Sequence, residues 1–241
     1  MVVPTPPWRR SARSVPDRPP LSQRRIVDQA LVLLAEEGLG AVSMRRVAQA
    51  LGTGPASLYA HLRNKEELHD LMLDQLIDEA TVPEPNPRHW REQLKELMRS
   101  MVRVMTDHPG SAQLAIATKV PTGPNALRVM EGMLAILRAG GLSDRVAAFA
   151  GDLIATYISA LALEAGTWAG HAPEAPAPVE LTRQIRDYFA ALPHDRFPHL
   201  VALAGPLTAG SVEERFEFGL EVLVAGLEGI SRTNGPAHDP A

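Results

Sequence analysis

The chain has 241 residues, of which 45% are hydrophobic and 22% charged, and it contains no cysteine. This length allows one or two domains with a substantial core, and the missing cysteine excludes disulfides, thiolate nucleophiles and cysteine-ligated metal sites. Residues 1–65 hold ten basic and four acidic side chains, whereas the remainder carries a net charge of −10. A basic head on an acidic body predicts an anionic partner for the head.

The first twenty residues contain six prolines and four arginines, and we expect them to form a flexible arm. They lack the apolar segment of a signal peptide, so a cytoplasmic protein is expected. Arg9, Arg10 and Arg13 lie on this arm, at a distance from the first helix that suits insertion into a DNA minor groove. The alternative is a tail without function.

Helical patterning begins directly after the arm. Apolar residues at helical spacing predict helices over about 22–38, 43–51, 55–61 and 64–82, and glycines follow the first two. Ser22, Ser43 and Asn64 are the expected N-caps, and Pro55 suits a first helical turn. The segment Ser43–His61 therefore has the pattern of a helix-turn-helix.

The predicted helices 43–51 and 55–61 pack on each other, and this packing determines which side chains of the second helix face solvent. Val47, Ala48, Leu51 and Leu58 have to face inward, against the apolar side of the first helix. The outward residues are then Pro55, Ala56, Ser57, Ala60 and His61. Such a helix fits a major groove, where apolar atoms contact thymine methyls. Because this set contains no Arg, Asn or Gln, we expect shape and methyl contacts to dominate base readout.

The stretch Ser43–Leu68, SMRRVAQALGTGPASLYAHLRNKEEL, closely resembles the N-terminal domain of the Tet repressor family. The most specific parts are the Leu-Tyr-x-His that begins at Leu58 and the Asn-Lys-x-x-Leu that begins at Asn64. The likeness covers residues 22–80 without a gap. It implies an all-α regulator with a DNA-binding head, most often a dimeric repressor of a palindromic operator.

The same resemblance implies roles for individual residues of the head. Tyr59 and Lys65 would hold DNA phosphates, together with N–H groups at the start of the fourth helix. Arg45 and Arg46 open the second helix, and we expect one of them to contact a base or a phosphate.

The rest of the chain is also helical by pattern. Helices are predicted near 88–107, 109–118, 124–139, 143–169, 178–191 and 211–231. No segment alternates as a strand does, so the fold is expected to be all-α. We expect a three-helix helix-turn-helix domain over 21–66 and a larger helical regulatory and dimerisation domain over 67–235. The apolar run 146–163 contains Asp152 near its middle, which is costly in a membrane, and we interpret it as a buried helix of a soluble protein.

Two helices carry seams that suit packing against another helix. One seam repeats at a 4-3-4 spacing through Phe216, Leu220, Leu223 and Leu227. The other consists of small residues, which allow close approach: Gly151, Ala155, Ser159 and Ala162. Both seams could belong to the core of one chain. Two of them late in the sequence also suit a four-helix interface between two copies, and we predict a homodimer on this basis.

A helical bundle often binds ligands between facing helices. The predicted effector pocket combines adaptable methionines with flat aromatic walls and one acid: Met98, Met101, Met105, Met130, Met133, Tyr157, Trp168 and Glu164. Each of these residues could instead be ordinary core.

The body also resembles the tetracycline-repressor type of regulatory domain, more loosely. The likeness lies in the segments that begin at Pro124, Gly140 and Ala162. That type holds a magnesium–drug chelate with a histidine, a threonine and a glutamate from the partner subunit. Glu164 falls at the glutamate position, but Leu114 or a neighbour stands in place of the histidine. We therefore expect a bulky, apolar small molecule rather than magnesium–tetracycline.

Other classes of protein have less support from the sequence. A DNA-binding regulator or activator without a ligand is the first alternative, and a helical enzyme is the second. The pair His194 and His199 is a weak hint of a metal site, and phosphate-loop, nucleophile-elbow and zinc-protease motifs are missing. We expect no catalytic site, no metal and no cofactor. The expected partners are operator DNA, an effector and a second copy of the chain, and no association with a membrane is expected.

Overall fold

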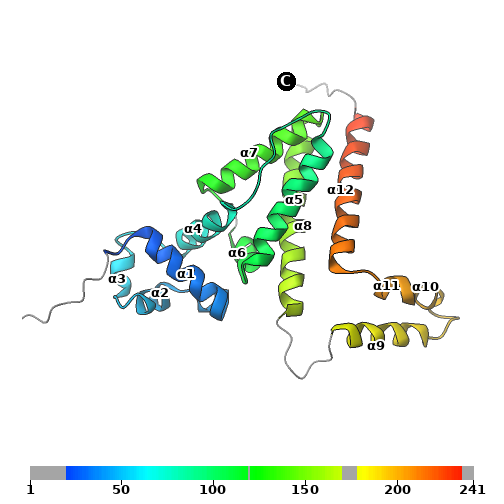
Figure 1. The fold of residues 1–241 in the computed structure, drawn as a ribbon, viewed down its shortest axis with the longest axis horizontal. Coiled ribbons are helices and arrows are strands. Elements are labelled where there is room, and N and C mark those ends of the chain that lie inside the picture. Colours follow the sequence, from blue (N-terminus) through cyan, green and yellow to red (C-terminus); the bar gives the residue numbers. More distant parts are fainter. Residues whose placement is uncertain (1–19, 119, 170–177, 235–241) are drawn as a thin grey trace, which may run out of the picture.

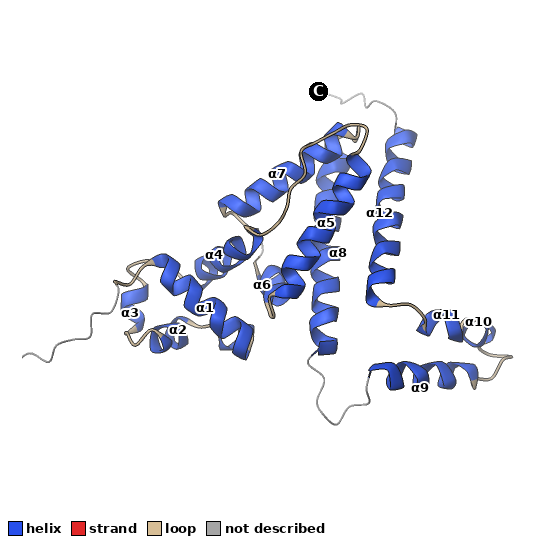
Figure 2. Cartoon of the chain, viewed as in Figure 1, coloured by secondary structure: helices blue, strands red, loops and turns tan. Residues whose placement is uncertain are grey.

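The structure is a computed structural model that describes residues 20–118, 120–169 and 178–234. The described residues form helices joined by loops, without strands (Figure 2). In chain order the elements are α1 Gln23–Glu37, the 3-10 turn η1 Leu39–Ala41, α2 Met44–Ala50, α3 Pro55–Leu58, α4 Lys65–Ile77, α5 Trp90–Asp107, α6 Ser111–Ala117, α7 Pro124–Ala139, α8 Asp144–Ala169, α9 Pro178–Ala190, α10 Pro198–Ala202, α11 Ala204–Thr208 and α12 Val212–Asn234. The all-α prediction is confirmed.

Local sequence signals determine where the first helices begin. The side chains of Ser22, Ser43 and Asn64 accept hydrogen bonds from the N–H groups of the third residues of α1, α2 and α4. Each therefore satisfies one N–H group that the helix itself leaves without an acceptor. Gly38, with φ of +79°, ends α1 in a backbone conformation that other residues rarely adopt.

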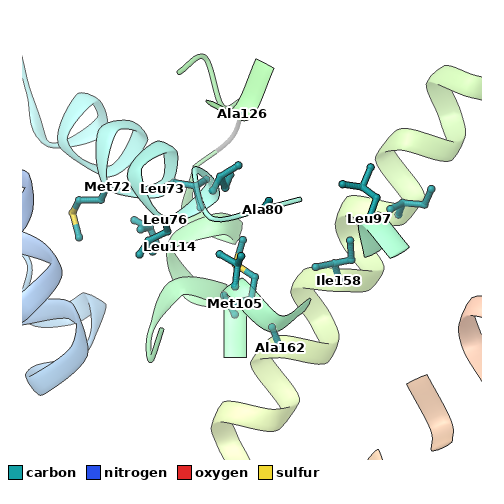
Figure 3. Close-up of a cluster of buried hydrophobic side chains, with 14 of the residues drawn as sticks. Met72, Leu73, Leu76, Ala80, Leu97, Met105, Leu114, Ala126, Ile158 and Ala162 are labelled. Atoms are coloured by element: carbon teal, nitrogen blue, oxygen red, sulfur yellow. The ribbon is translucent and has the colours of Figure 1, made fainter. Parts of the chain in front are cut away.

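The head, α1 to α3, lies at one end of the molecule, and α4 leads from it into the body (Figure 1). In the body α5 and α8 pack together, α7 lies across both, and α12 packs against α8 and α5. One buried apolar cluster runs from the head into the body through α4. Leu76 of α4 lies beside Leu114 of α6 at this junction, whereas Met72 points toward the head (Figure 3). The expected division at residue 66 therefore falls at the start of a helix that packs on both parts.

One helix of the described chain, α8 over Asp144–Glu164, is long and apolar enough to cross a membrane by length and composition. Only 28% of its apolar window is buried inside the chain. The expectation of a buried helix is therefore wrong for one face: Ile154 and Ile158 lie in the core, whereas Phe149 is 64% exposed and Leu153 is 49% exposed.

Two other predictions are corrected by the structure. Helix α3 ends at Leu58 rather than near His61, and residues 59–61 form a turn. The segment 193–210, for which no helix is predicted, contains α10 and α11, which pack on α9. These three helices form a separate layer beyond α12 (Figure 1).

Candidate DNA interface and regulatory core

The exposed face of α3 and the turn after it is the candidate DNA-reading surface. Leu58 is fully buried against the head's core, as expected, which directs its neighbours outward. The outward set is exposed as predicted: Pro55, Ala56, Ser57, Ala60 and His61. The hydroxyl of Thr53 donates to that of Ser57 over 3.0 Å. Sequence patterning does not predict this hydroxyl pair, which restrains the side chain of Ser57.

The predicted phosphate-binding groups lie around this surface. Tyr59 is 54% exposed, Lys65 is half-buried at the first position of α4, and Arg45 is exposed on α2. Arg46 is different, because its guanidinium pairs with Glu37 of α1 at 2.5 Å. Of the two arginines, Arg45 is therefore the more exposed one, and its contact with DNA remains a prediction. The arm residues Arg9, Arg10 and Arg13 lie outside the described residues.

A buried carboxylate fastens α4 to α7. Asp74 of α4 is 7% exposed and lies against the N-terminus of α7. Its Oδ1 accepts from the backbone N–H groups of Asn125, at 2.8 Å, and Ala126, at 2.9 Å. A Cβ at Gly123 would lie 2.2 Å from the Asp74 carboxylate, so only glycine permits this approach. A negative charge at a helix N-terminus also interacts favourably with the helix dipole.

Two further contacts make this joint reciprocal. One turn before Asp74, the carboxylate of Asp70 accepts from the hydroxyl of Thr122 at 2.6 Å and from its N–H at 3.0 Å. In the opposite direction, Arg128 of α7 donates to carbonyl oxygens at the end of α4 and just after it, including that of Ala80 at 3.1 Å. Each helix thus caps the other. We define Asp70, Asp74, Thr122, Asn125 and Arg128 as the α4–α7 joint.

On its other side α4 contacts the head. Gln75 donates to Asp28 of α1 at 2.9 Å. At the start of α6, a Cβ on Gly110 would lie 2.7 Å from the side chain of Leu34. A displacement of α6 or α7 would therefore act on α1 and α4 directly, because packed interiors transmit displacement rather than absorb it.

The predicted effector-pocket residues differ in burial. Met98 and Met105 are buried in the core, Met101 and Met133 are half-buried, and Met130 is 39% exposed. Tyr157 stacks on Phe216 with 6.4 Å between ring centroids, and Glu164 is exposed. The side chain of Trp168 lies outside the described residues. This pocket remains a prediction.

A groove of about 450 Å³ does open between α5, α8 and α12. It is lined by Arg99, Val102, Arg103, Thr106, Leu161, Val212, Glu213, Phe216 and Glu217. Three ion pairs join α5 to α12 beside it: Arg91–Glu228, Lys95–Glu221 and Arg99–Glu217. The hydrogen bond from Arg99 lowers the pKa of Glu217, and the bond to Glu221 raises the pKa of Lys95, so both pairs favour the charged forms.

The predicted interface seams lie mainly inside the chain. Phe216, Leu220 and Leu227 of α12 are at most 8% exposed. On α8, Ala162 is buried, and Gly151 faces Met133 of α7. Leu223 and Ser159 are half-buried, and only Ala155 is exposed. These seams therefore pack mainly within one chain, which is the alternative that the sequence left open.

The same two helices also carry exposed apolar side chains, on faces next to the packed seams. Phe149 and Leu153 on α8, and Phe218 and Val222 on α12, are between 49% and 71% exposed. Large exposed apolar side chains of this kind make these faces candidates for an interaction site. Among the described residues, three or more His, Asp or Glu side chains do not gather in a metal-binding arrangement.

A helix-turn-helix head that is joined through one helix to an acidic helical bundle defines a helix-turn-helix transcriptional regulator. Family models match both parts: bacterial regulatory proteins of the tetR family over residues 26–71, and the tetracyclin repressor-like C-terminal domain over residues 82–230. The chain belongs to the tetR family of transcriptional regulators.

Similar proteins include regulators from Saccharopolyspora and Streptomyces species. An HTH-type transcriptional regulator of Saccharopolyspora erythraea is 32% identical, over 91% of this chain and 90% of its own length. The HTH-type transcriptional repressor DrrR1 of Streptomyces coeruleorubidus is also 32% identical, over 88% of this chain and 78% of its own. The crystal structure of apo ActR from Streptomyces coelicolor is 46% identical and matches with a TM-score of 0.80, covering 90% of this chain and 99% of ActR. ActR has also been solved in complex with actinorhodin, and that structure matches with a TM-score of 0.79. These relatives are transcriptional regulators.

Proposed function

We propose that this protein is a dimeric repressor that binds a palindromic operator in the cytoplasm and leaves it when a small molecule binds the acidic body. The observation that carries this proposal is the position of α4. It begins at the reading surface with Lys65, packs on α1, and is fastened to α7 by the buried Asp74. A ligand that moves the body helices would act through α4 on the spacing of two heads.

In this proposal α3 lies in the major groove. Ser57, held by Thr53, and the small apolar residues beside it contact base edges and thymine methyls. Tyr59, Lys65 and Arg45 contact phosphates, while the pair between Arg46 and Glu37 holds α2 on α1. The arm arginines would add contacts in the adjacent minor groove.

The charge of Lys65 provides a direct test of phosphate contact. Lys65→Gln should weaken operator and non-operator DNA alike, and the slope of log affinity against log salt concentration should fall by about one unit per subunit, because one fewer counterion is released. Fluorescence anisotropy over a salt series measures this slope. Arg88→Gln, on the exposed loop before α5, is the matched control and should leave the slope unchanged. An unchanged slope for the Lys65 variant would remove this residue from the interface.

Two subunits are proposed to associate through the free apolar faces of α8 and α12. These faces are adjacent because α12 packs on α8. Two helices from each copy would form a four-helix interface, and two-fold symmetry would place two heads on successive major grooves, roughly 34–36 Å apart.

The effector is proposed to be a bulky, apolar small molecule similar to the ligands found in the ActR structures. Support comes from the 46% identity to ActR, whose structures contain actinorhodin or (S)-DNPA. The absence of a histidine at the tetracycline-type position argues against a magnesium–tetracycline complex. The test is to titrate the operator-bound protein with actinorhodin, (S)-DNPA and magnesium–tetracycline. Release by either of the first two supports the proposal, and release by magnesium–tetracycline alone would refute the effector class.

A further inference from the structure

The ion pairs between α5 and α12 follow a regular register. The two helices run antiparallel, so pairs advance along α5 through Arg91, Lys95 and Arg99 while they move back along α12. The Lys95–Glu221 pair measures 2.5 Å, and Arg99 binds Glu217 with two hydrogen bonds of 2.7 Å. A step of four residues on each helix separates these last two pairs, and the next step leads to Arg103 and Glu213.

This fourth position is open. Arg103 and Glu213 both line the groove of about 450 Å³, and the described ion pairs do not include one between them. Both side chains are exposed. The guanidinium of Arg99 beside them is already neutralised by Glu217. The groove thus carries an available cation on its α5 wall and an available anion on its α12 wall.

The floor of the groove is apolar. Val102 and Leu161 are half-buried, and Phe216 is 8% exposed, with its ring stacked on Tyr157. The volume falls within the range of about 300–1,000 Å³ that is common for small-molecule sites. An occupant would therefore cover an apolar floor between two charges of opposite sign, about one helical turn beyond the last ion pair.

We propose that this groove binds an amphipathic aromatic acid that completes the open fourth position. Its acidic group accepts hydrogen bonds from Arg103, its apolar body lies on Phe216 and Leu161, and a hydroxyl or amino group at its other edge donates to Glu213. A planar guanidinium suits a carboxylate or sulfonate, because it presents parallel N–H donors. The occupant would hold α12, which also carries the free face of Phe218, at a defined distance from α5. This effect on the position of α12 rests on the proposed function, in which a small molecule bound in the body releases DNA.

The binding test uses two fluorescent probes and the full chain without DNA. The probe 8-anilino-1-naphthalenesulfonate is an aromatic acid, and N-phenyl-1-naphthylamine has the same rings without the acid. Arg103→Gln should lower the affinity for the sulfonate about tenfold, which is typical of losing one charge-assisted hydrogen bond, and should leave the affinity for the neutral probe within about twofold. Glu213→Gln should raise the affinity for the sulfonate, because it removes a nearby negative charge.

Arg138→Gln is the matched control, since Arg138 lines a second groove, between α7 and α8, and pairs there with Asp144. It should leave both affinities unchanged. Equal sulfonate binding by wild type and the Arg103 variant would overturn the site. The site would also be overturned if the wild type did not bind the sulfonate, or if the Arg138 variant lost as much sulfonate affinity as the Arg103 variant. Unchanged binding of the neutral probe shows that the Arg103 variant is folded. Because DNA is absent, failure here leaves the proposed repressor function standing, whereas failure to bind any operator would refute that function alone.

Discussion

Asp74→Ala should lower the free energy of unfolding by about 3 kcal/mol. It should also weaken the coupling by which a ligand bound in the body changes DNA binding by the head. The carboxylate is 7% exposed and accepts from two backbone N–H groups at the start of α7. Removing a buried acceptor leaves its donors unsatisfied, at roughly 1–3 kcal/mol for each group. Urea denaturation followed by circular dichroism measures the loss of stability.

Three comparison variants distinguish a specific loss of the α4–α7 joint from a general loss of stability. Asp74→Asn keeps one acceptor oxygen and should recover about half of the lost stability. Asp70→Ala removes the more exposed cap of Thr122 and should cost only about 1 kcal/mol. Gly123→Ala should approach the effect of Asp74→Ala, because its Cβ would lie 2.2 Å from the carboxylate. A stability of Asp74→Ala within about 0.5 kcal/mol of wild type would contradict the α4–α7 joint, since this is the range of neutral surface substitutions.

The second large effect is expected at the free faces of α8 and α12. The double variant Phe149→Glu, Phe218→Glu should be a folded monomer, because it places charges on two aromatic side chains that are 64% and 71% exposed in one chain and would be buried between two. Operator affinity should fall by at least about a hundredfold, since one head alone binds only a half-site. Sedimentation velocity at micromolar concentration and anisotropy with operator DNA measure the two effects.

Ile116→Glu provides the control for this variant. Ile116 is 58% exposed but lies on α6, outside the α8–α12 face. It should leave both the dimer and operator binding unchanged. A dimeric Phe149, Phe218 double variant with normal operator affinity would place the interface elsewhere on the molecule.

Most of the fold could be predicted because its signals are local. The capping serines at 22 and 43, the asparagine at 64 and helical spacing of apolar residues each act within one or two turns, and all three caps are present as predicted. The outward set of the reading surface followed from the same local geometry. Helices α10 and α11 were missed because five-residue helices contain too little periodic pattern.

The candidate sites depend on contacts that a local pattern does not contain. Asp74 and Asn125 are 51 residues apart, and on sequence alone Asp70 and Asp74 resemble the solvated face of a helix. For the same reason, the sequence pattern does not identify the surface through which two copies associate. The spacing of Phe216, Leu220 and Leu227 predicts a packed seam, but it does not say whether the neighbouring helix belongs to the same chain.

The central claim is that two copies of this chain read DNA through paired α3 helices. Selection of bound sequences from a random DNA pool by the purified full-length protein, at physiological salt, tests it most directly. The account predicts recovery of a palindrome whose half-sites are centred about one helical turn apart, 10–10.5 base pairs, or a multiple of that distance. Enrichment of a single unrepeated site, or of no sequence at all, would contradict it.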